Sequence, residues 1–262
     1  MVKCYVINME KDHARREFIT TQLDDLKMKY AIFNGVNGKA LTLEETLQHY
    51  DHEKAVQAWR ELTFGEIGCA LSHIGVCRDM LENDVSHALI LEDDARLSLG
   101  VPAILQKLKA RFSAEDPILV LLSRVRRYRR KNRISLDENI QVVDIFENHH
   151  IYGDVFGAHG YFLTRQAAKR FVDHLYPVWI INDFWPKFQK MGFLQIKALV
   201  PYCIAHSHFS AESSIEYDRE ELETDRFVKS KPWKHLFFRY VYQKFIFQIF
   251  IRPFLKNQKK NW

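Results

Sequence analysis

The chain has 262 residues, of which 47% are hydrophobic, and a formal net charge of +5, so one large α/β domain or two small ones can bury a substantial core. Its four cysteines form no CxxC pair, which excludes a dense disulfide framework and predicts buried free thiols in a reducing compartment. The N-terminal apolar run is too short for a signal peptide, and no stretch reaches the roughly 18 apolar residues of a spanning helix, so we expect a cytoplasmic protein.

Strands and helices are predicted to alternate along the chain. The expected strands are residues 3–8, 30–33, 87–91, 118–122, 161–163, 194–200 and 203–205. The expected helices are residues 12–28, 63–83, 101–112 and 166–175, with 42–62 helical in part and another helix starting near Asp183. This alternation indicates an α/β fold with a mostly parallel sheet and helices on both of its faces.

Residues 124–133 hold seven basic side chains in ten positions and follow a buried strand. Such a run is most simply an exposed, solvated loop. Clustered Lys and Arg also attract anionic groups, so contact with the phosphates of a lipid-linked acceptor or with a membrane surface is the alternative.

Three consecutive carboxylates, Glu92, Asp93 and Asp94, stand where the apolar strand 87–91 leaves the sheet. In open α/β sheets, ligands bind beyond the carboxyl ends of strands. Clustered carboxylates repel one another unless a cation relieves them, and Mg²⁺ or Mn²⁺ takes carboxylate and phosphate oxygens as ligands. The triplet therefore indicates a site for a metal and a diphosphate, with a solvated acidic turn as the structural alternative.

Several segments together resemble bacterial glycosyltransferase family 25, the lipooligosaccharide glycosyltransferases. The similar segments occur in the family's order and span about residues 2 to 215; they are Tyr5–Asn8, Arg15–Arg16, Leu62–His73, Ala88–Asp94 and Gly157–Tyr161. The Gly-Glu-Ile-Gly-Cys and Leu-Glu-Asp-Asp sequences within them are the specific ones. The chain departs from the family at Asn37-Gly38, where Asp-Gly is usual, and at Phe64, where Pro or a small residue is usual.

The resemblance implies a GT-A type, Rossmann-like fold, a nucleotide-sugar donor that is often UDP-galactose, and a lipooligosaccharide acceptor. Glu92, Asp93 and Asp94 would stand at the family's Asp-x-Asp metal motif, with Asp94 the direct ligand of Mn²⁺ or Mg²⁺. The expected activity is inverting, metal-dependent hexosyl transfer. Transfer of glucose or another hexose by the same fold is the enzymatic alternative.

Several further residues are expected to line the donor site. Asn8 ends the first similar segment, and Arg15 lies in the first turn of a helix, where a bound diphosphate would be favoured; an exposed arginine pair, Arg15 and Arg16, is the plain alternative. The capping-box helix contributes a further polar set, Gly65, Glu66, Ser72 and His73. Gly65 would allow a ligand to approach the backbone closely, and the resemblance places Ser72 and His73 at the donor. The alternatives are a capping-box role alone for Glu66 and a hydrogen-bonded structural role for His73.

Two later positions complete the expected site. An inverting transfer needs a base for the acceptor hydroxyl, and the family has an acidic residue at a place matching Asp183; a helix cap is the alternative role. Metal-dependent GT-A enzymes often add a late histidine to the metal, and His206 or His208 can serve. The two alternate with Ser207 and face the same way on a strand, and His208 is preferred.

The tail 226–262 contains ten Lys or Arg and no Asp or Glu, whereas residues 1–225 carry a net charge of −5. Its aromatic side chains alternate with basic ones, as in an interfacial amphipathic helix on anionic lipid. We therefore predict a catalytic domain at 1–225 and a membrane-associating tail, peripheral on the cytoplasmic face of a bacterial inner membrane. A tail helix packed on the body or on a second subunit is the alternative.

A different class, a basic nucleic-acid-binding or membrane-binding protein without catalysis, is suggested by the arginine run and the tail. No recognisable nucleic-acid module appears, and the acidic triplet would repel phosphate without metal, so no nucleic-acid partner is expected. The sequence leaves the oligomeric state open.

Overall fold

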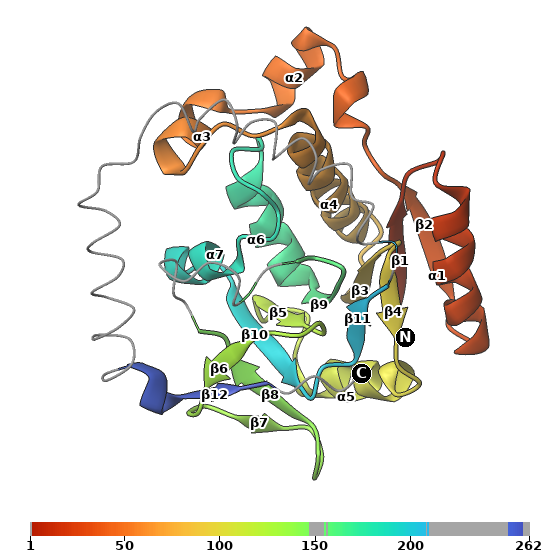
Figure 1. The fold of residues 1–262 in the computed structure, drawn as a ribbon, viewed down its shortest axis with the longest axis vertical. Coiled ribbons are helices and arrows are strands. Elements are labelled where there is room, and N and C mark those ends of the chain that lie inside the picture. The colour runs from red at the N-terminus through yellow and green to blue at the C-terminus, as the bar shows by residue number, and fades with distance from the viewer. Residues whose placement is uncertain (1, 147–154, 156, 208, 210–250, 259–262) are drawn as a thin grey trace.

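A computed structural model describes residues 2–146, 155, 157–207, 209 and 251–258 of the chain (Figure 1). Its centre is an eight-stranded sheet in the order β2-β1-β3-β9-β5-β10-β8-β7. The strands of this sheet are β1 (Lys3–Asn8), β2 (Tyr30–Asn34), β3 (His87–Glu92), β5 (Ile118–Leu121), β7 (Ile134–Ser135), β8 (Gln141–Asp144), β9 (Gly160–Thr164) and β10 (Gln195–Val200). Two small sheets pair β4 (Ala95–Leu97) with β11 (Ile204–His206), and β6 (Arg127–Arg129) with β12 (Leu255–Asn257).

The prediction of a mostly parallel sheet is confirmed, with two strands, β9 and β8, running in the opposite direction. β1 is parallel to both β2 and β3, and β5 is parallel to β10. Between these two groups lies β9, which is antiparallel to both β3 and β5. Every residue of β9 is buried, as in a central parallel strand, so the hydrophobic pattern could not reveal its direction.

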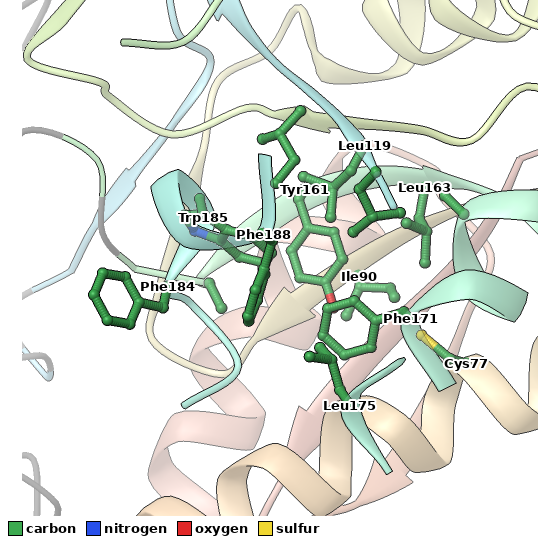
Figure 2. Close-up of a cluster of buried hydrophobic side chains, with 14 of the residues drawn as sticks. Cys77, Ile90, Leu119, Tyr161, Leu163, Phe171, Leu175, Phe184, Trp185 and Phe188 are labelled. Atoms are coloured by element: carbon green, nitrogen blue, oxygen red, sulfur yellow. The ribbon is translucent and has the colours of Figure 1, made fainter. Parts of the chain in front are cut away.

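Helices cover both faces of the sheet because successive strand residues point to opposite sides. Along β1, Tyr5 belongs to the core cluster shared with α4 (Phe64–Glu82), α6 (Arg165–Leu175) and α7 (Trp185–Met191). Its neighbours Cys4 and Val6 belong to the cluster shared with α1 (His13–Asp25) and α5 (Val101–Arg111). Figure 2 shows Tyr161 of β9 in the middle of the first cluster, beside Phe188 and Phe171.

The helix α4 begins where the sequence predicts. Thr63 Oγ1 accepts from Glu66 N at 3.0 Å, and Glu66 Oε2 accepts from Thr63 N at 3.0 Å, which completes the capping box. The short helices α2 (Leu43–His49) and α3 (His52–Ala58) precede it, as does the 3-10 turn η1 (Gly38–Ala40).

The backbone of the loop after β2 packs directly against the backbone of α4. A Cβ atom on Gly68 would lie 2.5 Å from Gly38 N and 2.5 Å from Val36 O, and one on Gly38 would lie 1.7 Å from Phe64 O. These contacts leave no room for a side chain, so glycine is required on both sides. Gly68, the second glycine of the Gly-Glu-Ile-Gly sequence, thus allows η1 to pack against the helix.

The prediction of an exposed loop over 124–133 is wrong in its centre. Residues 127–129 form β6, whose Tyr128 is buried, and β6 pairs with β12 from the far end of the chain. The basic run predicted a loop, and the strand could not be recognised locally because its pairing partner lies more than a hundred residues away. The preferred His208 and residues 226–250 of the predicted tail lie outside the described residues, whereas residues 252–257 form the 3-10 turn η4 (Arg252–Phe254) and β12. Within the described ranges, no helix has the length and apolarity needed to span a bilayer.

Candidate functional site

The acidic triplet lies at the carboxyl edge of the parallel strands. β3 ends at Glu92, and Asp93 and Asp94 form the turn that leads into β4. Ile7 of β1 is in register with Glu92, so Asn8 ends at the same edge. The antiparallel β9 starts there as well, and the backbone of Glu92 donates to His159 O at 3.2 Å.

Asp93 is held by two side chains from the first βα unit. Its Oδ2 accepts from Asn8 Nδ2 at 2.8 Å, and its Oδ1 accepts from Arg15 Nη1 at 3.0 Å. Arg16 Nε in turn donates to Asn8 Oδ1 at 2.7 Å, and Arg15 Nη2 donates to Phe209 O at 2.7 Å. Burial raises the pKa of Asp93, and the contacts with Asn8 and Arg15 oppose that rise. The arginine pair therefore orients the acidic turn.

Of the three carboxylates in the triplet, Asp94 receives the least stabilisation from neighbouring side chains. It is 9% exposed, and its Oδ1 has no hydrogen-bond partner within the described part of the chain. Burial, followed by the nearby Glu92 charge, raises the pKa of Asp94 to about 7. A buried carboxylate oxygen without a hydrogen bond is costly, and a bound cation would stabilise it.

Glu92 forms the end of a buried chain of polar groups. His73 Nε2 lies 3.2 Å from Glu92 Oε1, and His73 Nδ1 lies 2.8 Å from Tyr161 Oη. Burial raises the pKa of Tyr161 well above 10, so its hydroxyl keeps the proton and donates to His73 Nδ1. His73 Nε2 then donates to Glu92. Burial alone would raise the pKa of Glu92, but this hydrogen bond and the surrounding imidazoles hold it below the usual value.

Two histidines meet beside the turn. The ring centroids of His159 and His206 are 3.7 Å apart, and His206 is in register with Ala95, the residue after Asp94. Burial, followed by the proximity of His206, lowers the pKa of His159 to about 4, so this imidazole is neutral near pH 7. Its Nδ1 is buried and has no hydrogen-bond partner among the described residues. Neutral imidazole next to carboxylate oxygens is a donor set that divalent metals accept.

Asp183 reaches this edge through Gly157. Asp183 Oδ2 accepts from Gly157 N at 2.9 Å, and Trp185 Nε1 donates to Gly157 O at 3.0 Å. Gly157 has a φ of +95°, and a Cβ there would lie 2.8 Å from the His159 ring and 3.9 Å from His206 Nε2. Although it is distant from the triplet in sequence, Asp183 is thus connected to the histidine pair by one residue.

The polar set on α4 divides into two groups. His73 reaches Glu92, whereas Ser72 Oγ donates to Gly68 O and accepts from Val36 N, both at 2.8 Å. Glu66 completes the capping box and accepts from Arg60 Nη1 at 2.8 Å. Gly65 lies half-buried in the first helical turn. The hydroxyl of Ser72 and the carboxylate of Glu66 therefore stabilise the loops around α4.

Sequence reasoning missed His159 and the hydroxyl of Tyr161 as members of the polar network. The only signal was their place in the weak Gly157–Tyr161 similarity, because β9 is otherwise a plain apolar strand. Of the two late histidines, His206 is described and lies beside the acidic turn. Cys69 was missed too, and its Sγ lies with ligand atoms of His73 and Glu92 in a group no wider than 4.8 Å.

Comparisons with known proteins agree with one another. Residues 1–185 match the model of a family described as glycosyltransferase family 25 (LPS biosynthesis protein). Procollagen galactosyltransferase 2 of Mus musculus is 23% identical over 261 residues, which cover 88% of this chain and 40% of that protein. A glycosyltransferase 25 family member of Drosophila melanogaster is 31% identical over 105 residues, covering 36% of this chain and 16% of that protein. The chain thus spans well under half the length of these relatives.

Among solved structures, A197 from STIV superposes with a TM-score of 0.41 at 12% identity, covering 76% of this chain and 81% of that one. A likeness at this level carries no weight for fold or function.

Proposed function

Because this chain belongs to glycosyltransferase family 25, we propose that it transfers a hexose, galactose from UDP-galactose, to a lipooligosaccharide or lipopolysaccharide acceptor. The galactosyl donor is supported by relatives named as procollagen galactosyltransferases. The acceptor is supported by the family's description as LPS biosynthesis proteins. A GT-A type fold is supported by the parallel strands that present an acidic turn at their carboxyl edge.

The observation that carries the proposal is the Asp94 carboxyl, buried at this edge with an oxygen that lacks a hydrogen bond among the described residues. The donor set of carboxylate oxygens and neutral imidazole fits Mn²⁺ or Mg²⁺. Asp94 would hold the cation, together with His206 or with His208, which lies outside the described residues. A bound cation would neutralise negative charge on the departing diphosphate.

The remaining residues orient the carboxylates of the acidic turn or accept a proton from the acceptor. Asn8 and Arg15 fix Asp93 in the turn, and His73 keeps Glu92 ionised. Asp183, oriented by Gly157 N, takes the proton of the acceptor hydroxyl while that oxygen attacks the anomeric carbon and the nucleoside diphosphate leaves from the opposite side. The sugar is then transferred with inversion, and Asp183 releases its proton to water.

The donor is assigned to the space beside α1 and the first turns of α4. Arg15 would contact it directly, since its partly exposed guanidinium already touches the acidic turn, and the buried His73 would line the site through Glu92. Gly65 allows close approach of a ligand to the helix backbone. Glu66 and Ser72 would shape this wall by holding the loops that form it.

The test is a screen of UDP-sugars with Mn²⁺, measuring slow donor hydrolysis by the purified chain and by Asp94→Asn. We expect UDP-galactose to be hydrolysed fastest, EDTA to abolish the activity, and Asp94→Asn to lower it at least about a hundredfold, the usual scale for losing a metal ligand or charge stabiliser. Asp25→Asn removes an exposed carboxylate from the end of α1 and should leave the rate unchanged.

Full activity in EDTA would exclude the metal proposal. A preference for UDP-glucose would replace galactose by the alternative hexose and keep the reaction class. A folded chain that hydrolyses no donor would favour a binding protein without catalysis.

We also propose that the tail 226–262 holds the enzyme on the cytoplasmic face of a bacterial inner membrane. Its ten basic residues and its aromatic side chains support binding to anionic lipid. Replacing the six Lys and Arg of residues 226–250 by Gln, which spares β12 and Gln258, should release the chain from phosphatidylglycerol vesicles in a flotation assay, and neutral phosphatidylcholine vesicles serve as the control. Unchanged flotation of this variant would contradict this localisation.

A further inference from the structure

A second polar feature lies where β6 and β12 pair, away from the acidic turn and its neighbours β4 and β11 (Figure 1). A cavity of about 470 Å³ opens there, within the size range of small-molecule sites. Its lining consists of Arg127, Arg130, Arg252, Pro253, Leu255, Lys256 and Asn257. Four of these seven residues are cationic, and none is acidic or aromatic.

The cavity has fixed walls because the C-terminal strand is anchored in the body. Gln258 is buried; its Oε1 accepts from Val125 N at 2.9 Å, and its Nε2 donates to Leu199 O at 2.9 Å. Its backbone N–H donates to Arg126 O at 3.1 Å. Leu255 is buried against Phe146. These contacts hold β12 beside β6 and bring two basic segments together.

Arg130 crosses from one segment to the other. Its backbone N–H donates to Phe254 O at 3.1 Å, and its Nε donates to Leu255 O at 3.1 Å. These bonds fix the start of the guanidinium group at the cavity wall. Guanidinium groups bind phosphate oxygens in pairs, and a lysine adds a compact positive charge.

The two segments that line the cavity contribute no acidic side chain to it. Residues 124–133 and 251–258 contain no Asp or Glu. The nearby carboxylate of Asp144 on β8 is engaged by Lys197 Nζ at 2.7 Å and by Asn132 Nδ2 at 3.0 Å. Four cationic side chains around one cavity, of which Arg127 and Arg252 also have other interactions, attract a compact polyanion.

We propose that this cavity is a second ligand site, which binds the phosphate groups of a phosphorylated ligand through Arg127, Arg130, Arg252 and Lys256. The cavity is large enough for a phosphomonoester or diphosphate with part of its carrier. Among the described residues, its lining lacks the aromatic side chains on which single-stranded nucleic acids stack, which disfavours a polymer of nucleotides. The phosphate can belong to a soluble sugar phosphate or to a lipid headgroup, and the site is independent of the proposed transfer reaction.

The experiment titrates inorganic pyrophosphate into the full chain by calorimetry in EDTA, so that no metal bridges pyrophosphate to the acidic turn. Lys256→Glu places a negative charge in the cavity. Lys131→Glu makes the same change at an exposed position of the same basic segment, outside the lining. Thermal unfolding of both variants checks that they fold. Arg252→Gln is a milder second variant.

We expect saturable binding near one equivalent, weakened at least about tenfold by Lys256→Glu, less by Arg252→Gln, and within about twofold of the parent for Lys131→Glu. Affinity for UDP with Mn²⁺ should be equal in all four proteins, which separates this site from the donor site. Equal weakening by the two glutamate variants would reduce the site to diffuse surface charge and overturn the proposal. Absence of saturable binding would overturn it as well.

Two further titrations distinguish the sources of phosphate. Stronger flotation with phosphatidic acid vesicles than with phosphatidylglycerol vesicles, lost in Lys256→Glu, assigns a phosphomonoester headgroup. Competition by glucose 1-phosphate without such flotation assigns a soluble sugar phosphate. A single-stranded oligonucleotide that binds more tightly than pyrophosphate and resists Lys256→Glu would contradict the proposal.

Discussion

At the residue scale, Asp94 is a carboxyl whose charged form the protein stabilises poorly by itself. Its neighbour Asp93 has partners on both oxygens, and Glu92 has His73, whereas Asp94 Oδ1 has no hydrogen bond among the described residues. The difference follows from the turn, which directs the three consecutive side chains into three surroundings. The surroundings of Asp94 are those in which we propose the cation to bind.

The raised pKa of Asp94 makes the metal-free protein sensitive to pH. A carboxyl whose folded-state pKa of about 7 exceeds the usual value of 3.8 binds its proton more tightly in the folded state. Stability should therefore fall as pH rises from about 4 to about 7, by a few kcal/mol, since one pKa unit corresponds to about 1.4 kcal/mol. Urea denaturation in EDTA at pH 5 and pH 8 measures the change.

Asp94→Asn should remove this part of the pH dependence, and saturating Mn²⁺ should remove it in the parent by stabilising the carboxylate. The comparison must be with the parent, because His159 has a lowered pKa and contributes stability that is lost as pH falls from 6.5 through about 4. An identical pH profile in Asp94→Asn would show that another group titrates.

At the element scale, the seating of α4 decides where His73 points. The capping box fixes the first turn of the helix, and Gly68 lets the loop after β2 approach the helix backbone. Ser72 Oγ then accepts from Val36 N, one turn along the helix. His73 is the next residue of the helix, and its side chain contacts Glu92 at the end of β3. The glycines and the polar residues of this sequence are thus parts of one packing arrangement.

Gly68→Ala should be strongly destabilising, because its Cβ would meet two backbone atoms at 2.5 Å. We expect a loss of at least about 2 kcal/mol of unfolding free energy, in the range of overpacked interiors, and a lower activity as His73 shifts. Gly100→Ala is the matched control, since its Cβ would find neighbours at 3.7 Å and beyond. Equal stability of the two variants in chemical denaturation would disprove the close packing of this loop.

At the scale of the whole molecule, one large hydrophobic cluster packs on each face of the central sheet. In addition, residues 255–257 pair with residues 127–129, from the middle of the sequence. β12 pairs with β6, and Gln258 bonds to the backbone on both sides of that strand pair. The pairing forms a wall of the basic cavity, and it buries Tyr128, which a solvated loop would leave exposed. A stretch of arginines becomes a strand because a distant segment satisfies its backbone.

Gln258→Ala should detach this strand. Removing the side chain leaves Val125 N and Leu199 O buried without partners, which costs about 1–3 kcal/mol each if they stay buried. Hydrogen exchange at residues 125–129 should become faster by tenfold or more, whereas Asn257→Ala, at an exposed neighbour on the same strand, should leave it near the parent rate. Unchanged exchange in Gln258→Ala would mean that the rest of β12 suffices.

Much of the fold could be predicted because its signals are local. The apolar runs of β1, β3 and β5 and the capping box of α4 depend on neighbouring residues, and the structure confirms them. The short strands β4, β7 and β8 were not predicted. Each has four residues or fewer, and their identity as strands depends on partners elsewhere in the sheet.

The sequence alone determined that an acidic triplet ends a buried strand and that the chain resembles family 25. Both conclusions depend on short runs of consecutive residues. Only the tertiary structure decided that Asn8 and Arg15 hold Asp93, that His159 and His206 meet beside the turn, and that Asp183 is linked to them through Gly157. It likewise decided that β12 closes a basic cavity with β6. The physical reason is that these contacts join strand ends and loops far apart along the chain, where the order of the strands, and not the local pattern of residues, sets which side chains meet.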